Sequence, residues 1–199
     1  MIPVTMQPEP PDFDQKVRQK GQQFLATTTP AKDSDWKNHG YWRAALPELK
    51  KGHNNICAYC CLWIPNCPGA PTVDHYLHKS KKENQSLAYE WSNFRLAAGR
   101  MNSRKGVFTD VLDPFIVQEG WFIIDFLPTI TVKPNPTLPD IEKSKVQASI
   151  KRLKLDRDEN YLNDMQEWYD SFKSNEITFG HLEKRAPFLA YELRRQGLA

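Results

Sequence analysis

The sequence contains no hydrophobic segment long enough to cross a membrane. Its longest apolar cluster, residues 121–127, spans seven residues and includes an aspartate, whereas a membrane-spanning helix needs about 20 apolar residues. The first residues, MIPVTMQPEPPDFD, contain neither a basic stretch nor an apolar core, so no secretory signal is visible. We therefore expect a cytoplasmic protein with no membrane partner.

Cysteine is scarce, and its four copies are clustered at positions 57, 60, 61 and 67. Without a secretory signal, this cluster does not indicate a disulfide framework. The spacing Cys57-x-x-Cys60 is typical of one half of a structural zinc site. The same spacing is equally compatible with a cluster of buried thiols, and the pattern leaves both interpretations open.

Charge is unevenly distributed along the chain. Residues 74–106 carry seven basic and three acidic side chains, a net charge of +4, whereas the whole chain carries +3. Such a window is either solvated surface or a patch that faces phosphate groups. The basic residues of this window are Lys79, Lys81, Lys82, Arg95, Arg100, Arg104 and Lys105.

The hydrophobic pattern predicts an α+β protein that is mostly helical and contains a small hairpin-plus-helix module. Helices are expected over residues 12–26, 42–49 and 100–105, and in three segments after residue 140. Strands are expected over residues 72–77, 94–97, 121–126 and 129–132, and residues 53–73 are expected to be irregular.

Three prolines within residues 133–139 predict a linker. The chain then divides into an N-terminal helical region (1–52), a core with a following hairpin (53–133) and a C-terminal helical region (134–199). The last region carries an aromatic stripe that either packs onto the N-terminal helices or contacts a partner. The stripe consists of Tyr161, Trp168, Tyr169 and Phe172.

Polar residues between positions 74 and 105 could together hydrolyse a phosphodiester bond. This reaction needs a general base for water and a cation near the phosphate. His75 has a suitable ordinary pKa, and Asp74 and Asn102 each offer an oxygen of the kind that Mg²⁺ prefers. Strand alternation sends Asp74 and His75 to opposite faces unless a bulge or twist intervenes. Asn93 could hold the imidazole or its loop in place, and Lys105 shares a helical face with Asn102.

In this order the residues resemble the HNH endonuclease family, whose fold is a ββα-metal finger. Asp74-His75 matches the first element, Asn93-Phe-Arg-Leu the second, and Asn102-x-x-Lys105-Gly the third. Because the final position is Asn, the pattern is similar to the H-N-N variant in the HNH domain of CRISPR effector nucleases. The resemblance implies that Asp74 and Asn102 bind one catalytic Mg²⁺ or Mn²⁺ ion, that His75 is the base, and that Asn93 belongs to the catalytic site.

The expected substrate is nucleic acid, with DNA favoured over RNA. Lys105 and the adjacent Arg104 are predicted to bind its phosphates. The active site of this family contacts phosphate rather than base, so cleavage of RNA stays open as an alternative. A non-catalytic subunit that binds nucleic acid or a partner is the other alternative.

One feature departs from the family pattern. Many HNH proteins bind a structural zinc ion with two Cys-x-x-Cys pairs, and Cys57/Cys60 matches the first pair. The second pair would fall at Ala98 and Met101, which cannot bind zinc in that way. Four other residues could complete an unusual site, and nothing in the sequence selects among them: Cys61, Cys67, His53 and His78.

The flanking segments are similar to the PtuB-like HNH subunit of Septu-type antiphage systems. The similar segments are Cys-Ala-Tyr-Cys, Asp-His-x-x-x-Lys-Ser, Ala-Tyr-Glu-Trp-Ser-Asn and Asn-Ser-x-Lys-Gly, followed by a helical tail. Those proteins work with an ATPase. This chain has no phosphate-binding loop of the Gly-x-x-x-x-Gly-Lys type, so the resemblance implies an ATPase subunit in trans and a role as nuclease effector in antiphage defence.

Overall fold

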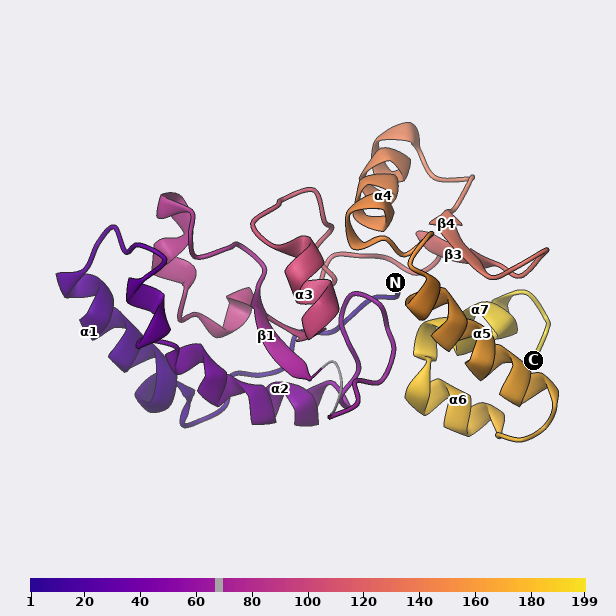
Figure 1. Cartoon of the computed structure of the whole chain (residues 1–199), viewed down its shortest axis with the longest axis horizontal. Coiled ribbons are helices and arrows are strands. Elements are labelled where there is room, and N and C mark those ends of the chain that lie inside the picture. The colour runs from indigo at the N-terminus through magenta and orange to yellow at the C-terminus, as the bar shows by residue number, and fades with distance from the viewer. Residues whose placement is uncertain (67–69) are drawn as a thin grey trace. The chain divides into compact units, whose positions relative to one another are not determined.

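The computed structural model describes residues 1–66 and 70–199, and its fold is α+β with two small antiparallel sheets (Figure 1). The described chain forms two compact units. We call residues 6–55 and 64–109 the N-terminal unit, and residues 1–5, 56–63 and 110–199 the C-terminal unit. Within the described ranges, no helix is both long and apolar enough to cross a bilayer.

The N-terminal unit begins with helices that pack through aromatic side chains. Its helical elements before the first strand are η1 (Asp14–Arg18), α1 (Gln19–Thr27), η2 (Asp35–Lys37), η3 (Tyr41–Ala45) and α2 (Leu46–Gly52). Phe24 of α1 lies edge-on to Trp36, and Trp36 lies edge-on to Trp42. The ring of Tyr89 packs so closely on α1 that a Cβ at Gly21 would overlap it. Gly21 therefore permits the contact that joins this helix to the rest of the unit.

The sheet of the N-terminal unit is an antiparallel pair followed at once by a helix. Strand β1 (Pro71–His75) pairs with β2 (Phe94–Ala98), and Asp74 lies opposite Arg95. Residues 76–93 connect the strands and contain two short helices, η4 (Lys82–Leu87) and η5 (Trp91–Asn93). Helix α3 (Gly99–Lys105) packs on both strands and ends at Gly106, whose positive φ of 50° suits glycine. These three elements confirm the predicted strands and helix within two residues.

The C-terminal unit combines a second hairpin with four helices. Strands β3 (Phe122–Asp125) and β4 (Thr131–Pro134) pair antiparallel. The helices are α4 (Asp140–Leu153), α5 (Glu159–Lys173), α6 (Phe179–Arg185) and α7 (Pro187–Arg195). Helix α4 buries Val146, Ile150 and Leu153 as its periodicity predicts, but Ile141 is 67% exposed because it lies in the first turn.

This division differs from the three regions expected from the sequence. The N-terminal helices share a unit with β1, β2 and α3, whereas the hairpin of residues 122–134 belongs with the C-terminal helices. The proline-rich segment 133–139 therefore joins β4 to α4 inside one unit. A run of prolines shows only that the chain is extended there, and the contacts of the elements on either side decide where a unit ends.

The aromatic stripe of α5 packs within the C-terminal unit. The Tyr161 hydroxyl donates to the carbonyl of Cys60 at 3.3 Å, and Tyr161 is buried. Ring contacts join Trp168 to His181, Tyr169 to Phe126 and Phe172 to Phe179. The stripe thus has neighbours in its own unit, on the hairpin and on α6.

Candidate active-site cavity

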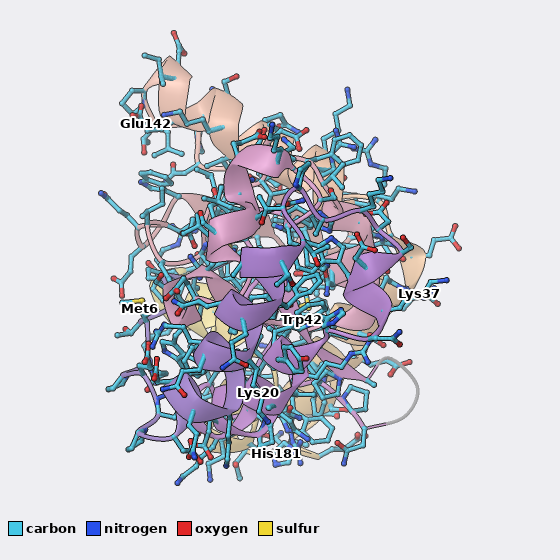
Figure 2. All side chains as sticks on the ribbon, turned by 90° about the vertical axis from the view of Figure 1, so that its left-hand side faces the viewer. Met6, Lys20, Lys37, Trp42, Glu142 and His181 are labelled. Carbon is cyan, nitrogen blue, oxygen red and sulfur yellow. The ribbon has the colours of Figure 1, made fainter. Side chains whose placement is uncertain are left out.

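A cavity of about 400 Å³ lies between the first strand of the N-terminal unit and the helical turn η3. Its polar lining consists of Arg43, Thr72, His75, His78, Lys79 and Asn102. Trp42 also lines it, and Figure 2 views the unit from its helical side with this residue labelled. No carboxylate is among the described residues of the lining. The cavity therefore carries cationic and neutral polar groups.

His75 ends β1 and is held in one tautomer by its surroundings. Its Nε2 lies 2.9 Å from the carbonyl oxygen of Ala88. A carbonyl can only accept, so Nε2 carries the proton and donates it, and the lone pair of the neutral ring is on Nδ1. Nδ1 has no hydrogen-bond partner among the residues described. Trp42 and Phe94 pack edge-on against the ring, with centroids 4.9 and 5.3 Å away.

Burial lowers the pKa of His75 to about 3, and the positive charge of Lys79 adds to this effect. The imidazole is therefore neutral at physiological pH. The lone pair on Nδ1 can accept a proton at the wall of the cavity, but a pKa of about 3 makes the ring a weak base, and a negative charge beside the ring is needed to raise this pKa.

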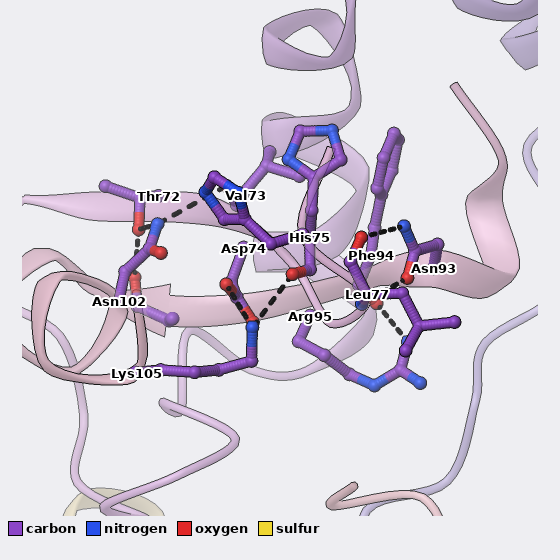
Figure 3. A network of polar contacts seen from close by, with 12 residues as sticks. Thr72, Val73, Asp74, His75, Leu77, Asn93, Phe94, Arg95, Asn102 and Lys105 are labelled. Carbon is purple, nitrogen blue, oxygen red and sulfur yellow. Dashed lines mark hydrogen bonds and ion pairs between the residues drawn. The ribbon is translucent and has the colours of Figure 1, made fainter. Parts of the chain in front are cut away.

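Asn93 binds the backbone of the segment that follows β1. Its Oδ1 accepts from the amide of Leu77 at 2.8 Å, and its Nδ2 donates to the carbonyls of Leu77 and Leu87 at 3.0 and 3.1 Å. Figure 3 shows this side chain facing Leu77 from the position directly before β2. Of the two roles that the sequence left open, holding the imidazole or holding its loop, the geometry shows contact with the loop.

Asp74 points to the opposite face of β1 from His75, as strand alternation predicts (Figure 3). Its Oδ1 accepts from the Lys105 ammonium at 3.0 Å, and both side chains are completely buried. Lys105 also donates to the carbonyl of His75 at 2.8 Å. These bonds connect the end of α3 to β1. A buried charge needs such a partner, because an unpaired one costs several kcal/mol, on the order of 3–5.

The two predicted metal ligands are each engaged with another side chain of the unit. The Asp74 carboxylate already holds a buried cation, and Asn102 lines the cavity while its Nδ2 donates to the Thr72 hydroxyl at 3.0 Å. Residues 1–66 and 70–199 contain no group of three or more His, Cys, Asp or Glu side chains arranged to hold a metal ion. An ion at Asp74 would have to take the place of the Lys105 ammonium.

The predicted phosphate ligands and the basic window do not form one surface. Lys105 would have to leave Asp74 to contact a phosphate, since its side chain is fully buried. Arg104 is half-buried near the end of α3. Arg95 is buried too, and its Nη1 donates to the carbonyls of Ser92 and Phe94 at 2.7 and 2.9 Å. Two of the seven basic side chains therefore serve internal contacts.

Among the lining residues that sequence reasoning did not assign to this cavity, four carry aromatic, cationic or imidazole groups: Trp42, Arg43, His78 and Lys79. The first two come from a helical turn some thirty positions before His75, and no spacing rule relates them to the motif. His78 and Lys79 follow Asp74-His75 closely in the sequence, so their imidazole and ammonium groups could have been assigned to the same site.

His78 supplies a second imidazole, in the same tautomer as His75. Its Nδ1 accepts from the amide of Ser80 at 3.2 Å and lies 2.8 Å from the hydroxyl of the same residue. The neutral ring therefore carries its proton on Nε2. Burial and the charge of Lys79 lower the pKa of His78 to about 4, so this ring is neutral as well.

Three of the four cysteines belong to the C-terminal unit. Cys57, Cys60 and Cys61 are buried thiols without a disulfide, and Cys67 lies outside the described residues. A hydrogen bond with Cys57 raises the pKa of the Cys60 thiol, and burial raises it further. His53 and His78 belong to the N-terminal unit. Zinc binding by Cys57 and Cys60 stays a prediction, for which the described residues supply no group of three ligands.

No family model matches the sequence, and no curated protein matches it. A functional assignment therefore depends on the chemistry of the residues and on their geometry.

Proposed function

We propose that the protein is an endonuclease of the HNH type that hydrolyses phosphodiester bonds in nucleic acid, with DNA favoured over RNA. The order β1, β2, α3 supports this proposal, because a ββα-metal finger has the same order. The main support is His75, a neutral imidazole whose Nδ1 lone pair is unengaged at a cavity that contains cations and no described carboxylate. This arrangement suits proton abstraction from water beside an anionic substrate.

The proposed reaction begins when Nδ1 of His75 accepts a proton from water. The resulting hydroxide forms a bond to phosphorus, and the bond from phosphorus to the leaving ester oxygen breaks. The leaving oxygen takes a proton from solvent. Nε2–H of His75 continues to donate to the carbonyl of Ala88, and this hydrogen bond strengthens when the ring becomes positive. Asn93 keeps the Leu77 segment in place beside the cavity.

The resemblance assigns a divalent ion to Asp74 and Asn102, and we keep this ion as part of the proposal. Such an ion supplies charge neutralisation at phosphate oxygens. Its requirement is tested directly when cleavage is measured with Mg²⁺, with Mn²⁺ and with EDTA.

The decisive experiment incubates the purified protein and its His75→Ala and His75→Gln variants with plasmid, single-stranded DNA and total RNA. Loss of a general base lowers the rate by about 10²–10⁴-fold. We expect this loss in both variants, with unchanged binding to an oligonucleotide. Equal cleavage by the wild type and by His75→Ala would contradict the proposal, and the substrate that is cut decides between DNA and RNA.

A second candidate, a non-catalytic subunit that binds nucleic acid or a partner, is favoured by one observation. Asp74 and Lys105 pair with each other and are inaccessible, as structural residues are. Under this alternative, none of the three substrates is cleaved under any metal condition, whereas oligonucleotide binding persists.

The similarity to PtuB-like subunits extends the proposal to antiphage defence with an ATPase partner. Trp168 and Phe172 of the aromatic stripe are half-buried and retain surface for a partner. We test them by co-purification of Trp168→Ala and Phe172→Ala with the product of a neighbouring gene, beside a thermal melt. Lost association at an unchanged melting temperature supports docking. A lowered melting temperature with association intact identifies the stripe as core.

A further inference from the structure

We infer that the N-terminal helical turn η3 completes the active-site cavity, and that Arg43 and Lys79 together bind a phosphate of the nucleic-acid backbone there. This inference rests on the proposed function for the identity of the ligand as nucleic acid. It gives the substrate-binding role to two residues outside the predicted phosphate ligands, one of which lies outside the β1–β2–α3 module altogether.

The charge of the cavity is the first observation. Arg43 and Lys79 are its cationic side chains, and no acidic side chain is among the described lining residues. A cavity with two cations and no carboxylate among its described lining residues attracts an anion.

The contacts of Lys79 are the second observation. Its ammonium lies 4.8 Å from the ring centroid of Trp42, in cation–π geometry, and it has no ion pair with a described carboxylate. Burial lowers the pKa of Lys79, and the charge of Asp33 opposes this effect. The ammonium is thus partly desolvated without being neutralised. Lys105, by contrast, forms a buried ion pair with Asp74.

Arg43 completes the pair from the other wall. It is exposed, it has no ion pair with a described acidic residue, and its charge lowers the pKa of Lys79, so the two cations are close enough to repel each other. A Cβ at Gly40 would come within 3.1 Å of the guanidinium carbon, so the absence of a side chain leaves this conformer its space. An anion bound between the two cations would relieve their repulsion, and a guanidinium suits phosphate by its paired donors.

The test measures binding of a fluorescein-labelled dT12 oligonucleotide by anisotropy, in EDTA, across a range of salt concentrations, with a gel to show that the probe stays intact. The variant is Arg43→Gln/Lys79→Gln. The matched control is Lys20→Gln/Lys37→Gln, which removes the same charge from two exposed lysines of the same unit outside the cavity (Figure 2).

Each lost phosphate contact on a single strand lowers the slope of log affinity against log salt by about 0.7. We expect the cavity variant to lose about one such contact or more and the control variant to keep the wild-type slope. Arg43→Lys/Lys79→Arg, which retains both charges, should keep the wild-type salt slope even where its affinity differs. A cavity variant that folds and shows the slope of the control would overturn the inference.

Cleavage assays on the same proteins separate this inference from the proposed function. If the wild type cuts its substrate and the cavity variant has unchanged binding and an unchanged KM, hydrolysis stands and the phosphate site is wrong. If the wild type cuts nothing but the cavity variant loses salt-dependent binding, the phosphate site stands and hydrolysis is wrong.

Discussion

The two faces of β1 differ in whether their charged groups are neutralised by an ion pair. On one face, Asp74 and Lys105 neutralise each other in a fully buried pair that also reaches the backbone. On the other face, Lys79 is held on an aromatic ring and His75 is neutral with one nitrogen unengaged. The adjacent residues Asp74 and His75 therefore have different roles. The face of Asp74 fixes α3 on the strand, and the face of His75 presents polar groups to the cavity.

The largest effect should come from breaking the buried pair. Lys105→Met leaves the Asp74 carboxylate buried without its cation, which costs about 3–5 kcal/mol of unfolding free energy. Urea denaturation of the full chain measures this change. The double variant Asp74→Leu/Lys105→Met removes both charges and should recover much of the loss. Equal destabilisation of the single and double variants would show that packing, not charge, dominates on this face.

The effect of a divalent ion on stability tests whether Asp74 can exchange its ammonium partner for a metal ion. If the ion takes the place of the ammonium at Asp74, Mn²⁺ should stabilise Lys105→Met more than the wild type, because no cation has to be displaced. Thermal melts with Mn²⁺ and with EDTA measure the difference, and Asn102→Ala should reduce it. An identical shift in the wild type and in Lys105→Met would speak against this location for the ion.

An intermediate effect is expected from Asn93, which holds the loop on the cavity side. Asn93→Ala removes the partner of the Leu77 amide and of the Leu77 carbonyl, whereas the Leu87 carbonyl still accepts from the amide of Glu90 at 3.2 Å. A buried polar group left unsatisfied costs about 1–3 kcal/mol, and half-buried Leu77 is close to the lower end of that range. Asn93→Asp keeps the acceptor but loses the donor. Amide hydrogen exchange should show the Leu77 amide less protected in Asn93→Ala and protected in Asn93→Asp.

The smallest effect is a dependence of stability on pH that comes from the cavity face. The folded pKa of His75 is about 3, below its ordinary value of about 6.5, so the unfolded chain binds more protons between these values. Stability is then lost as pH falls below about 6.5, by about 2 kcal/mol between pH 7 and pH 5. Denaturation curves of the wild type and His75→Gln at both pH values isolate this contribution. A difference between the two proteins that does not change with pH would contradict the buried neutral imidazole.

Local pattern was enough to predict the motif elements. Alternation in residues 72–77 predicted β1, and the same rule separated Asp74 from His75. The contact made by Lys105 could not be predicted from local pattern. Its spacing from Asn102 predicted a shared helical face, but its ammonium is buried on Asp74 because α3 packs across β1. Sequence spacing within a helix cannot reveal which strand residue lies beneath the helix.

The remaining part of the cavity depends on distant segments. Trp42 and Arg43 reach it only because the N-terminal helices share a unit with the sheet, and this packing leaves no short-range trace in the sequence. Charge counting had a similar limit. Arg95 and Lys105 count as basic residues in any window, yet their charge is used by backbone carbonyls and by Asp74.

The absence of a side chain at Gly21 links the first helix to the wall of the cavity. Tyr89 fills the space that a side chain there would need, donates to the carbonyl of His39 at 2.7 Å and contacts Trp42, whose edge meets His75. Positions 21 and 89 therefore form a coupled pair: a larger residue at one requires a smaller one at the other. A larger residue at position 21 would displace Tyr89 and, through Trp42, the wall that packs against the proposed base, although position 21 itself does not contact that base.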